Sequence, residues 1–323
     1  MRYRALGRTG LQVSEIGYGL WGMGGWSGSN DAESRRSLQM ALDTGVNFFD
    51  SAWAYGDGKS DSLLGELVRN NPGKPVYTAS KVPPKNDKWP ASPNDRLLDV
   101  FPPEHIVGYA ERIREALGIP TIDLLQLHVW DDRWADDRSW VEAVDELKAR
   151  GLIRWFGISL NRWEPWNGIR AVRGGHVDAV QVIYNIFDQA PEDELFPACR
   201  EMNVGVVARV PLDEGSLTGN LTLETRFPEG DWRGGYFGPE NLGPTVERVA
   251  HLRGDLPAGT SLPETALRFI LSNPDVSTTI VGMRKPEHVA ANVAASDAGA
   301  LDQKTIAGLR RHRWDRKPAP WSD

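Results

Sequence analysis

Short apolar runs and longer amphipathic segments alternate along most of this chain. The apolar runs are bounded by turn residues and are mostly rich in β-branched side chains, which is typical of strands buried on both faces. They predict eight strands, at residues 16–20, 47–50, 76–81, 122–128, 155–159, 179–184, 204–210 and 278–281.

The segments between these strands carry apolar residues at helical spacing. In residues 31–44, Leu38, Ala41 and Leu42 fall on one side of a helix that Asn30 or Asp31 would cap. The same pattern predicts helices around residues 63–67 and 140–147, and at 102–117, 195–202, 262–271, 288–295 and 301–311.

Eight strands that alternate with about as many helices predict parallel βαβ units. The number of units and the chain length favour closure into a parallel (β/α)8 TIM barrel of the α/β class over an open sheet. No Gly-x-Gly-x-x-Gly motif follows the first strand, which argues against a Rossmann fold. A β-hairpin at residues 3–13 precedes the barrel and residues 301–311 add a C-terminal helix, so we expect a single domain over residues 1–323.

Composition narrows the range of partners. The net charge of −7 argues against binding to nucleic acid, which favours a clustered basic patch. The single cysteine, Cys199, allows neither an intramolecular disulfide nor a multi-cysteine metal site. No apolar stretch is long enough to cross a membrane and the first residues lack the apolar core of a signal peptide, so we expect a cytoplasmic protein.

Four ionisable side chains follow consecutive predicted strands. Asp50, Lys81 and His128 stand at the ends of the second, third and fourth strands, and Tyr55 lies five residues after Asp50. Each has an ordinary explanation alone: a solvated lysine, a structural histidine, a capping aspartate or a packed tyrosine. Because the carboxyl ends of barrel strands meet at one mouth, their joint occurrence indicates an active site.

Together these residues suit the reduction of a carbonyl group. Hydride reduction needs a proton for the developing alkoxide, and tyrosine, with an ordinary pKa of ~10, is a suitable donor. A nearby Lys81 ammonium is expected to lower the pKa of Tyr55 toward the working range. Asp50 would pair with Lys81 and keep it charged, and His128 would bond the substrate oxygen.

Two long insertions follow predicted strands, at residues 83–101 after the third strand and 212–243 after the seventh. Long loops in a compact domain are usually functional or mobile. Barrel active sites are built from loops at this end of the strands, so we expect both insertions to border the site.

The segment Asn-Phe-Phe-Asp-Ser-Ala-Trp-Ala-Tyr-Gly, with Ser-Lys at 80–81 and Leu-His at 127–128, resembles the aldo-keto reductase family. The resemblance runs from Arg4 to Asn292 and points to the bacterial sugar and aldehyde reductase branch. It implies a (β/α)8 barrel and the same catalytic roles for the four residues above. It also implies NADPH-dependent, reversible reduction of aldehydes or ketones to alcohols, with sugars and aryl aldehydes as candidate substrates.

The resemblance further implies which residues hold the NADPH/NADP cofactor. Ser159 and Gln181 match residues that bind the nicotinamide carboxamide. The asparagine that follows this serine in the family is Leu160 here, and Asn161 comes one residue late. Arg209 occupies the place of an aromatic residue that stacks on the nicotinamide, a role that a planar guanidinium can also fill.

By the same resemblance, the loop after the seventh strand wraps the pyrophosphate and the segment after the eighth binds the adenosine end. Arg284 is the expected ligand of the 2′-phosphate because guanidinium matches phosphate geometry, and Lys285 is the reserve. Asn292 matches a residue that bonds the adenine. The other positions assigned to the cofactor are Pro211, Leu212, Ser216, Gly219, Gly282, Met283 and His288.

Thirteen tryptophans are present, and Trp21, Trp53 and Trp130 lie at or just after the first, second and fourth strands. They have two interpretations, structural packing or an aromatic wall around a small-molecule carbonyl substrate. Aromatic faces suit sugars, aryl aldehydes and steroid-like ketones alike, so they do not identify the substrate.

Two other functions compete with a reductase. The resemblance includes channel auxiliary subunits, so the chain could be a nicotinamide-binding regulatory or sensor subunit with little turnover. A metal-dependent isomerase or hydrolase would need several His, Asp or Glu ligands at strand ends. Only His128 and Asp50 qualify, and Lys81 beside them would repel a cation, so we expect no metal.

Overall fold

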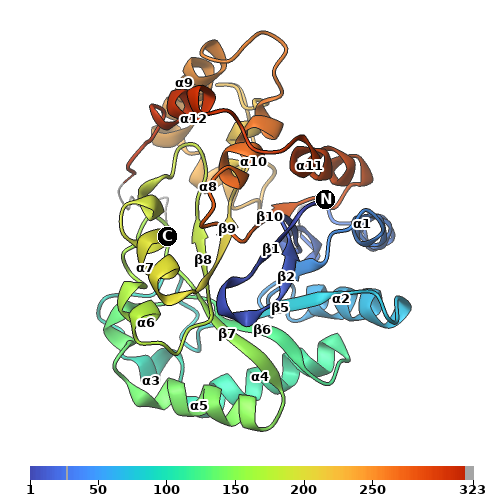
Figure 1. The fold of residues 1–323 in the computed structure, drawn as a ribbon, viewed down its shortest axis with the longest axis vertical. Helices are drawn as coiled ribbons and strands as arrows, with labels where there is room; N and C mark the ends of the chain where they lie inside the picture. Colours follow the sequence, from blue (N-terminus) through green and yellow to red (C-terminus); the bar gives the residue numbers. More distant parts are fainter. Residues whose placement is uncertain (27, 317–323) are drawn as a thin grey trace.

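The computed structural model describes residues 1–26 and 28–316, and eight parallel strands form its closed barrel (Figure 1). Hydrogen bonds join neighbours in the order β10, β3, β4, β5, β6, β7, β8, β9 and close the ring at β10. The strands are β3 (Ile16–Gly19), β4 (Phe48–Asp50), β5 (Tyr77–Val82), β6 (Ile122–Leu127), β7 (Ile153–Ser159), β8 (Ala179–Ile183), β9 (Gly205–Arg209) and β10 (Thr278–Gly282). The predicted barrel is confirmed, and no predicted strand end is wrong by more than two residues.

Helices surround the barrel (Figure 1). Those predicted from the sequence are α1 (Asp31–Asp43), α2 (Lys59–Asn70), α4 (Pro103–Leu117), α5 (Arg138–Ala149), α7 (Leu195–Met202), α10 (Leu262–Leu271), α11 (Pro286–Ala298) and α12 (Gln303–Arg310). The Asn30 side chain accepts a hydrogen bond from the Glu33 amide at 3.1 Å, which fixes the start of α1. Among the described residues, no helix combines the length and the apolarity needed to cross a bilayer.

Four helices were not predicted: α3 (Leu97–Val100), α6 (Ile169–Arg173), α8 (Arg233–Tyr236) and α9 (Pro239–Gly254). The first three have only four or five residues, too few for a periodic pattern. The longer helix, α9, begins within the insertion at 212–243 and buries Asn241 and Thr245 besides Val249 and Leu252. With two polar residues on its buried face, α9 gives little hydrophobic periodicity.

The N-terminal hairpin, β1 (Tyr3–Ala5) and β2 (Gln12–Ser14), covers one end of the barrel. Leu6, Leu11 and Val13 enter a buried cluster inside it. Gly7 has a φ of +49°, and a Cβ there would meet the Gly205 amide of β9 at 2.3 Å, so only glycine fits this close approach. The hairpin closes the amino ends of the strands, which leaves their carboxyl ends as the open mouth.

Alternation along the strands stacks the interior side chains in layers. The layer that the hairpin covers is apolar and contains Phe48, Ala79, Leu124, Ala179 and Val207. The residues two positions further along the same strands are polar: Asp50, Lys81, Gln126, Gln181 and Arg209. Since side chains two apart point the same way, each of these strands sends a polar side chain into the next layer, at the mouth.

Candidate active site

Asp50 and Lys81 form a buried ion pair at the mouth. Lys81 Nζ lies 2.5 Å from Asp50 Oδ2 and donates a second hydrogen bond of 2.7 Å to the Ser51 carbonyl. The two side chains are 1% and 0% exposed. The adjacent strands β4 and β5 bring them together, so the predicted pairing is confirmed.

Tyr55 and His128 complete a tetrad with this pair. The Lys81 ammonium lies 5.1 Å from the centre of the Tyr55 ring. The imidazole of His128, the first residue beyond β6, packs edge-on against the same ring with centres 5.6 Å apart. The four residues predicted to carry the chemistry therefore meet at one place.

The second oxygen of Asp50 is held by two amides. Oδ1 accepts hydrogen bonds from Gln126 Nε2 at 3.2 Å and Gln181 Nε2 at 2.9 Å. Gln126 was not predicted, although it lies two residues before His128 and so faces the same way. Gln181 was predicted to bind the nicotinamide amide. Its own amide nitrogen is engaged by Asp50, which leaves its carbonyl oxygen for a cofactor.

The electrostatics of the tetrad favour a charged lysine, a protonated tyrosine and a neutral histidine. Burial alone would lower the pKa of Lys81, but Asp50 and Tyr55 outweigh it and the pKa lies above its ordinary value. Lys81 acts to lower the pKa of Tyr55, as predicted, but burial is the larger effect and the net pKa lies above its ordinary value. Burial, assisted by the charges of Lys81 and Arg209, holds the pKa of His128 well below 6.5.

A further group of polar side chains ties α2 to the strands that carry the ion pair. Ser80 Oγ donates to Asp61 Oδ1 at 2.8 Å, and Ser51 Oγ lies 2.6 Å from Ser60 Oγ. Burial raises the pKa of Asp61 to about 6, against the hydrogen bonds from Ser51 and Ser80. These residues were not predicted, because a serine beside a catalytic residue has no distinctive pattern of its own.

Tryptophans border the tetrad, but two of them were not predicted. Trp26 packs edge-on against Tyr55 with ring centres 6.3 Å apart, and Trp89, from the insertion at 83–101, packs edge-on against His128 at 4.6 Å. Trp21, which was predicted, contacts Trp26 at 5.4 Å and is 38% exposed. The aromatic side of the mouth is therefore built from Trp21, Trp26 and Trp89.

The prediction that Trp130 lines the substrate site is wrong. Trp130 is fully buried and packs edge-on against Trp134 and Trp140, with ring centres 5.8 and 5.4 Å away. Trp53 packs edge-on against Tyr109 of α4 at 5.6 Å and belongs to the outer core. Both rings point into the layer between barrel and helices, where a large aromatic side chain can bury most of its surface.

Arg209 ends β9 and faces the mouth. Its Nη2 donates to the Leu160 carbonyl at 2.9 Å, whereas its Nε is buried and has no hydrogen-bond partner among the described residues. Burial, and then the charge of Arg162, lowers the pKa of Arg209 to about 10, so it stays cationic at neutral pH. Arg209 thus presents a charged group with unused hydrogen-bonding capacity.

The end of β7 differs from the predicted carboxamide site at one position. Ser159 is buried and is the register partner of Gln181 on β8. The Asn161 amide, however, bonds Glu164 at 3.0 Å and both backbone groups of Ala91 at 3.3 Å. The displaced asparagine therefore anchors the insertion at 83–101.

The loop after β9 contains η5 (Asp213–Thr218) and is held by its own side chains. Ser216 Oγ donates to Asp213 at 2.6 Å, and Asp213 also accepts from Arg316 at 2.7 Å. Ser216 is fully buried, so its hydroxyl does not face the mouth for the predicted pyrophosphate contact. The backbone of this loop is a better candidate than the Ser216 hydroxyl for contact with an anion. Asp213, Glu214 and Gly215 take φ values of +45°, +55° and +103°, and such turns can form an anion-binding concavity.

Three other predicted cofactor residues border this loop. Pro211 is buried and Leu212 half-buried. Gly219 has a φ of +74°, and a Cβ there would lie 1.9 Å from the Arg253 guanidinium. Local packing therefore explains Gly219 without a cofactor.

The segment after β10 presents a second guanidinium with an unused donor. Arg284 is half-buried, and its Nη1 has no hydrogen-bond partner in the part of the chain described. The buried Met283 uses its carbonyl to accept from Tyr18 at 3.0 Å. Asn292 is buried on α11, whose N-terminus follows Arg284 closely, and a helix N-terminus favours phosphate. Three predicted neighbours are exposed: Gly282, Lys285 and His288.

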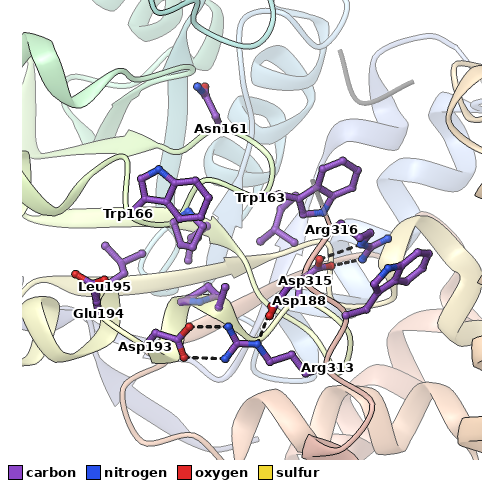
Figure 2. A pocket seen from close by; sticks show the side chains of 16 residues that line it. Asn161, Trp163, Trp166, Asp188, Asp193, Glu194, Leu195, Arg313, Asp315 and Arg316 are labelled. Atoms are coloured by element: carbon purple, nitrogen blue, oxygen red, sulfur yellow. Dashed lines mark hydrogen bonds and ion pairs between the residues drawn. The ribbon is translucent and has the colours of Figure 1, made fainter. Parts of the chain in front are cut away.

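A cavity of about 340 Å³ lies apart from the tetrad. It is bordered by Trp163 and Trp166 after β7 and by the C-terminal segment, where Arg313 pairs with Asp193 (Figure 2). Since no tetrad residue lines it, its size is no evidence for the place of the reaction.

The closed (β/α)8 barrel, with a buried Asp–Lys pair, a tyrosine and a histidine at its mouth, has an enzyme-like site. The model of the "Aldo/keto reductase family" matches residues 15–313, so the chain belongs to the aldo-keto reductase family. The resemblance stated from the sequence motifs is confirmed.

Relatives span nearly the whole chain. Aldo-keto reductase YhdN of Bacillus subtilis is 29% identical over 318 residues, covering 95% of this chain and 92% of its own. The NADH-specific methylglyoxal reductase of Escherichia coli is 28% identical over 333 residues, covering 95% and 98%. The solved holo form of an aldo-keto reductase from Bacillus halodurans superposes with a TM-score of 0.78 at 26% identity over 100% of both chains.

Proposed function

We propose that this protein is an NADPH-dependent reductase that converts aldehydes or ketones to alcohols. The observation that carries the proposal is the meeting of Asp50, Lys81, Tyr55 and His128 at the open end of the barrel. Membership of an oxidoreductase family supports it. The methylglyoxal reductase relative is named as NADH-specific, so the preference for NADPH rests on Arg284 of this chain.

In the proposed reaction, the Tyr55 hydroxyl donates its proton to the carbonyl oxygen. Lys81 lies beside Tyr55 and stabilises the phenolate that remains, while Asp50 keeps Lys81 charged and in place. Neutral His128 donates a hydrogen bond to the same oxygen and sets its angle. NADPH, when held there, would supply the hydride, so its two electrons and the proton from Tyr55 would balance the alcohol formed.

The residues present fit a dinucleotide phosphate. Arg284 offers a buried, unpartnered N–H close to the start of α11, the arrangement that a 2′-phosphate needs. The positive-φ turn at residues 213–215 is the candidate loop for the pyrophosphate. Its Asp213 and Gly215 amides already donate to Val210 and Leu212, so the Glu214 amide is the one proposed to face the anion. Ser159 and the free carbonyl oxygen of Gln181 lie beside each other in register for the nicotinamide carboxamide.

The proposal is tested by following NADPH oxidation across a panel of aldehydes, α-dicarbonyls and sugars. Turnover with at least one class, in proportion to enzyme, is the expected result. Tight NADPH binding with no turnover across the panel would instead indicate a regulatory or sensor subunit.

A further inference from the structure

We propose that the physiological substrate carries a carboxylate, and that Arg209 binds it beside the reacting carbonyl. This inference rests on the proposed reductase function and names its substrate class.

The position of Arg209 places it at the reacting centre. Val207, two residues earlier on β9, lies in the apolar layer inside the barrel, so Arg209 points from the same face of the strand into the tetrad layer. Besides Arg162 and Glu214, the tetrad residues Tyr55 and Asp50 are close enough for their charges to act on Arg209. A group bound by Arg209 therefore lies close to the carbonyl that Tyr55 protonates.

Two cations near Arg209 are paired with carboxylates. Lys81 is paired with Asp50, and Arg162 with Glu214 at 2.9 Å. Of the residues that the structure describes, none with a carboxylate lies within ion-pair distance of Arg209.

Two further carboxylates, both buried, are already paired with another arginine. Asp188 and Asp213 both bind Arg316 in the C-terminal segment, so they are not counter-ions for Arg209. Arg209 is half-buried, and leaving its buried Nε without a partner is unfavourable, a cost that an anionic ligand would relieve.

The wall beside Arg209 fits the apolar body of such a substrate. Ring contacts run from Trp26 to Trp21 at 5.4 Å and from Trp21 to Trp232 at 6.2 Å. The Arg162 guanidinium then covers Trp232 at 5.5 Å and acts electrostatically on Arg209. The mouth is therefore aromatic from Trp26 to Trp232, and the Arg162–Glu214 pair and Arg209 stand at its end.

One unpaired guanidinium matches one negative charge. A carboxylate can accept from Nε and from a second N–H of the same planar group, which is the usual bidentate geometry. A phosphate dianion would leave one charge uncompensated. We therefore assign a monoanionic carboxylate rather than a phosphate ester.

The experiment compares matched substrate pairs. With NADPH saturating, kcat/KM is measured for 4-carboxybenzaldehyde and its methyl ester, and for glyceraldehyde 3-phosphate and glyceraldehyde. The wild type is expected to prefer the acid to the ester by at least about tenfold, and to show less discrimination within the phosphate pair.

Variants assign the preference to Arg209. Arg209→Gln is expected to lower the acid-to-ester ratio roughly 10- to 100-fold, the effect of losing one charge-assisted hydrogen bond. Because Arg209 also stands in the nicotinamide position, the readout is this ratio and not the activity towards either substrate alone. Arg209→Lys restores part of the ratio. The matched control is Arg200→Gln, which removes an exposed arginine of α7 that pairs with Asp275 and is expected to leave the ratio unchanged.

Each outcome has one meaning. No reduction of any of the four compounds or of the wider aldehyde panel overturns the reductase function itself. Reduction of the neutral compounds without an acid preference overturns only the carboxylate inference. Stronger discrimination within the phosphate pair overturns the choice of carboxylate. Equal losses for acid and ester with weakened NADPH binding in Arg209→Gln would make Arg209 a cofactor ligand only.

Discussion

The two halves of the barrel mouth differ in how far their polar groups are satisfied. On the β4 to β8 side, both oxygens of Asp50 are bonded, one to Lys81 and the other to Gln126 and Gln181. On the β9 to β10 side, Arg209 and Arg284 each carry a buried N–H without a partner among the described residues.

This difference separates preorganised chemistry from ligand recognition. The first half is held in place by its own bonds before any ligand arrives, which is what a proton donor needs. In the second half, the described part of the protein supplies no anion for these N–H groups. A site that binds phosphate or carboxylate needs such free donors. Four substitutions test the contrast, beginning with the largest expected effect.

Tyr55→Phe is expected to lower kcat by roughly 10²- to 10⁴-fold, the contribution of general acid catalysis. Because the ring and its contacts with Trp26 and His128 remain, NADPH binding measured by fluorescence should be nearly unchanged. A variant that kept more than about half of the wild-type turnover would show that Tyr55 is not the proton donor.

Arg284→Ala is expected to weaken NADPH binding by about one to two decades and leave NADH binding almost unchanged. The reason is the loss of a charge-assisted contact to the 2′-phosphate, worth about 1.5–3 kcal/mol. Titration of both cofactors checks it, with Lys285→Ala as the matched control because that neighbour is exposed. Equal losses for the two cofactors would remove Arg284 from the 2′-phosphate site.

Asp61→Asn tests whether ionisation of the buried Asp61 carboxyl, which bonds Ser80 next to Lys81, destabilises the protein. The pKa of Asp61 is raised from 3.8 to about 6, so the folded state holds its proton more tightly and this group's ionisation destabilises the protein as pH rises through that window. The free energy of unfolding of the variant relative to wild type should therefore increase between about pH 4 and 7, by at most about 3 kcal/mol. Urea melts at both pH values measure it, and a difference independent of pH would contradict the raised pKa.

Arg209→Tyr should produce the smallest change, which is expected in the ratio of NADPH affinity to NADP⁺ affinity. A cation beside the nicotinamide opposes the oxidised, positively charged ring more than the neutral reduced one. Wild type is therefore expected to bind NADPH several-fold tighter than NADP⁺, and the variant to narrow that ratio. If fluorescence titrations of the two redox forms gave the same ratio for both proteins, Arg209 would have no electrostatic effect on the ring.

The tetrad was predictable because Asp50, Lys81 and His128 stand where predicted strands end and Tyr55 follows Asp50 by five residues, and strands of a barrel converge at that end. Gln126 could have been found by the same rule, since it shares the inward face of β6 with His128. The substrate wall could not be found in this way. Trp26 and Trp89 lie in connecting segments, whose path over the mouth depends on contacts such as that of Asn161 with Ala91.

The sequence by itself determined the order of strands and helices, the closed barrel and the four residues of the tetrad. These follow from local periodicity and from motifs at strand ends, which need no knowledge of distant contacts. Only the tertiary structure decided which polar groups are satisfied. Asp213 and Glu214 follow Arg209 closely in the chain, yet they pair with Arg316 and Arg162 instead. Ion pairing depends on which loops fold back over the mouth. That Arg209 has no carboxylate partner among the described residues can therefore be known only from the tertiary structure.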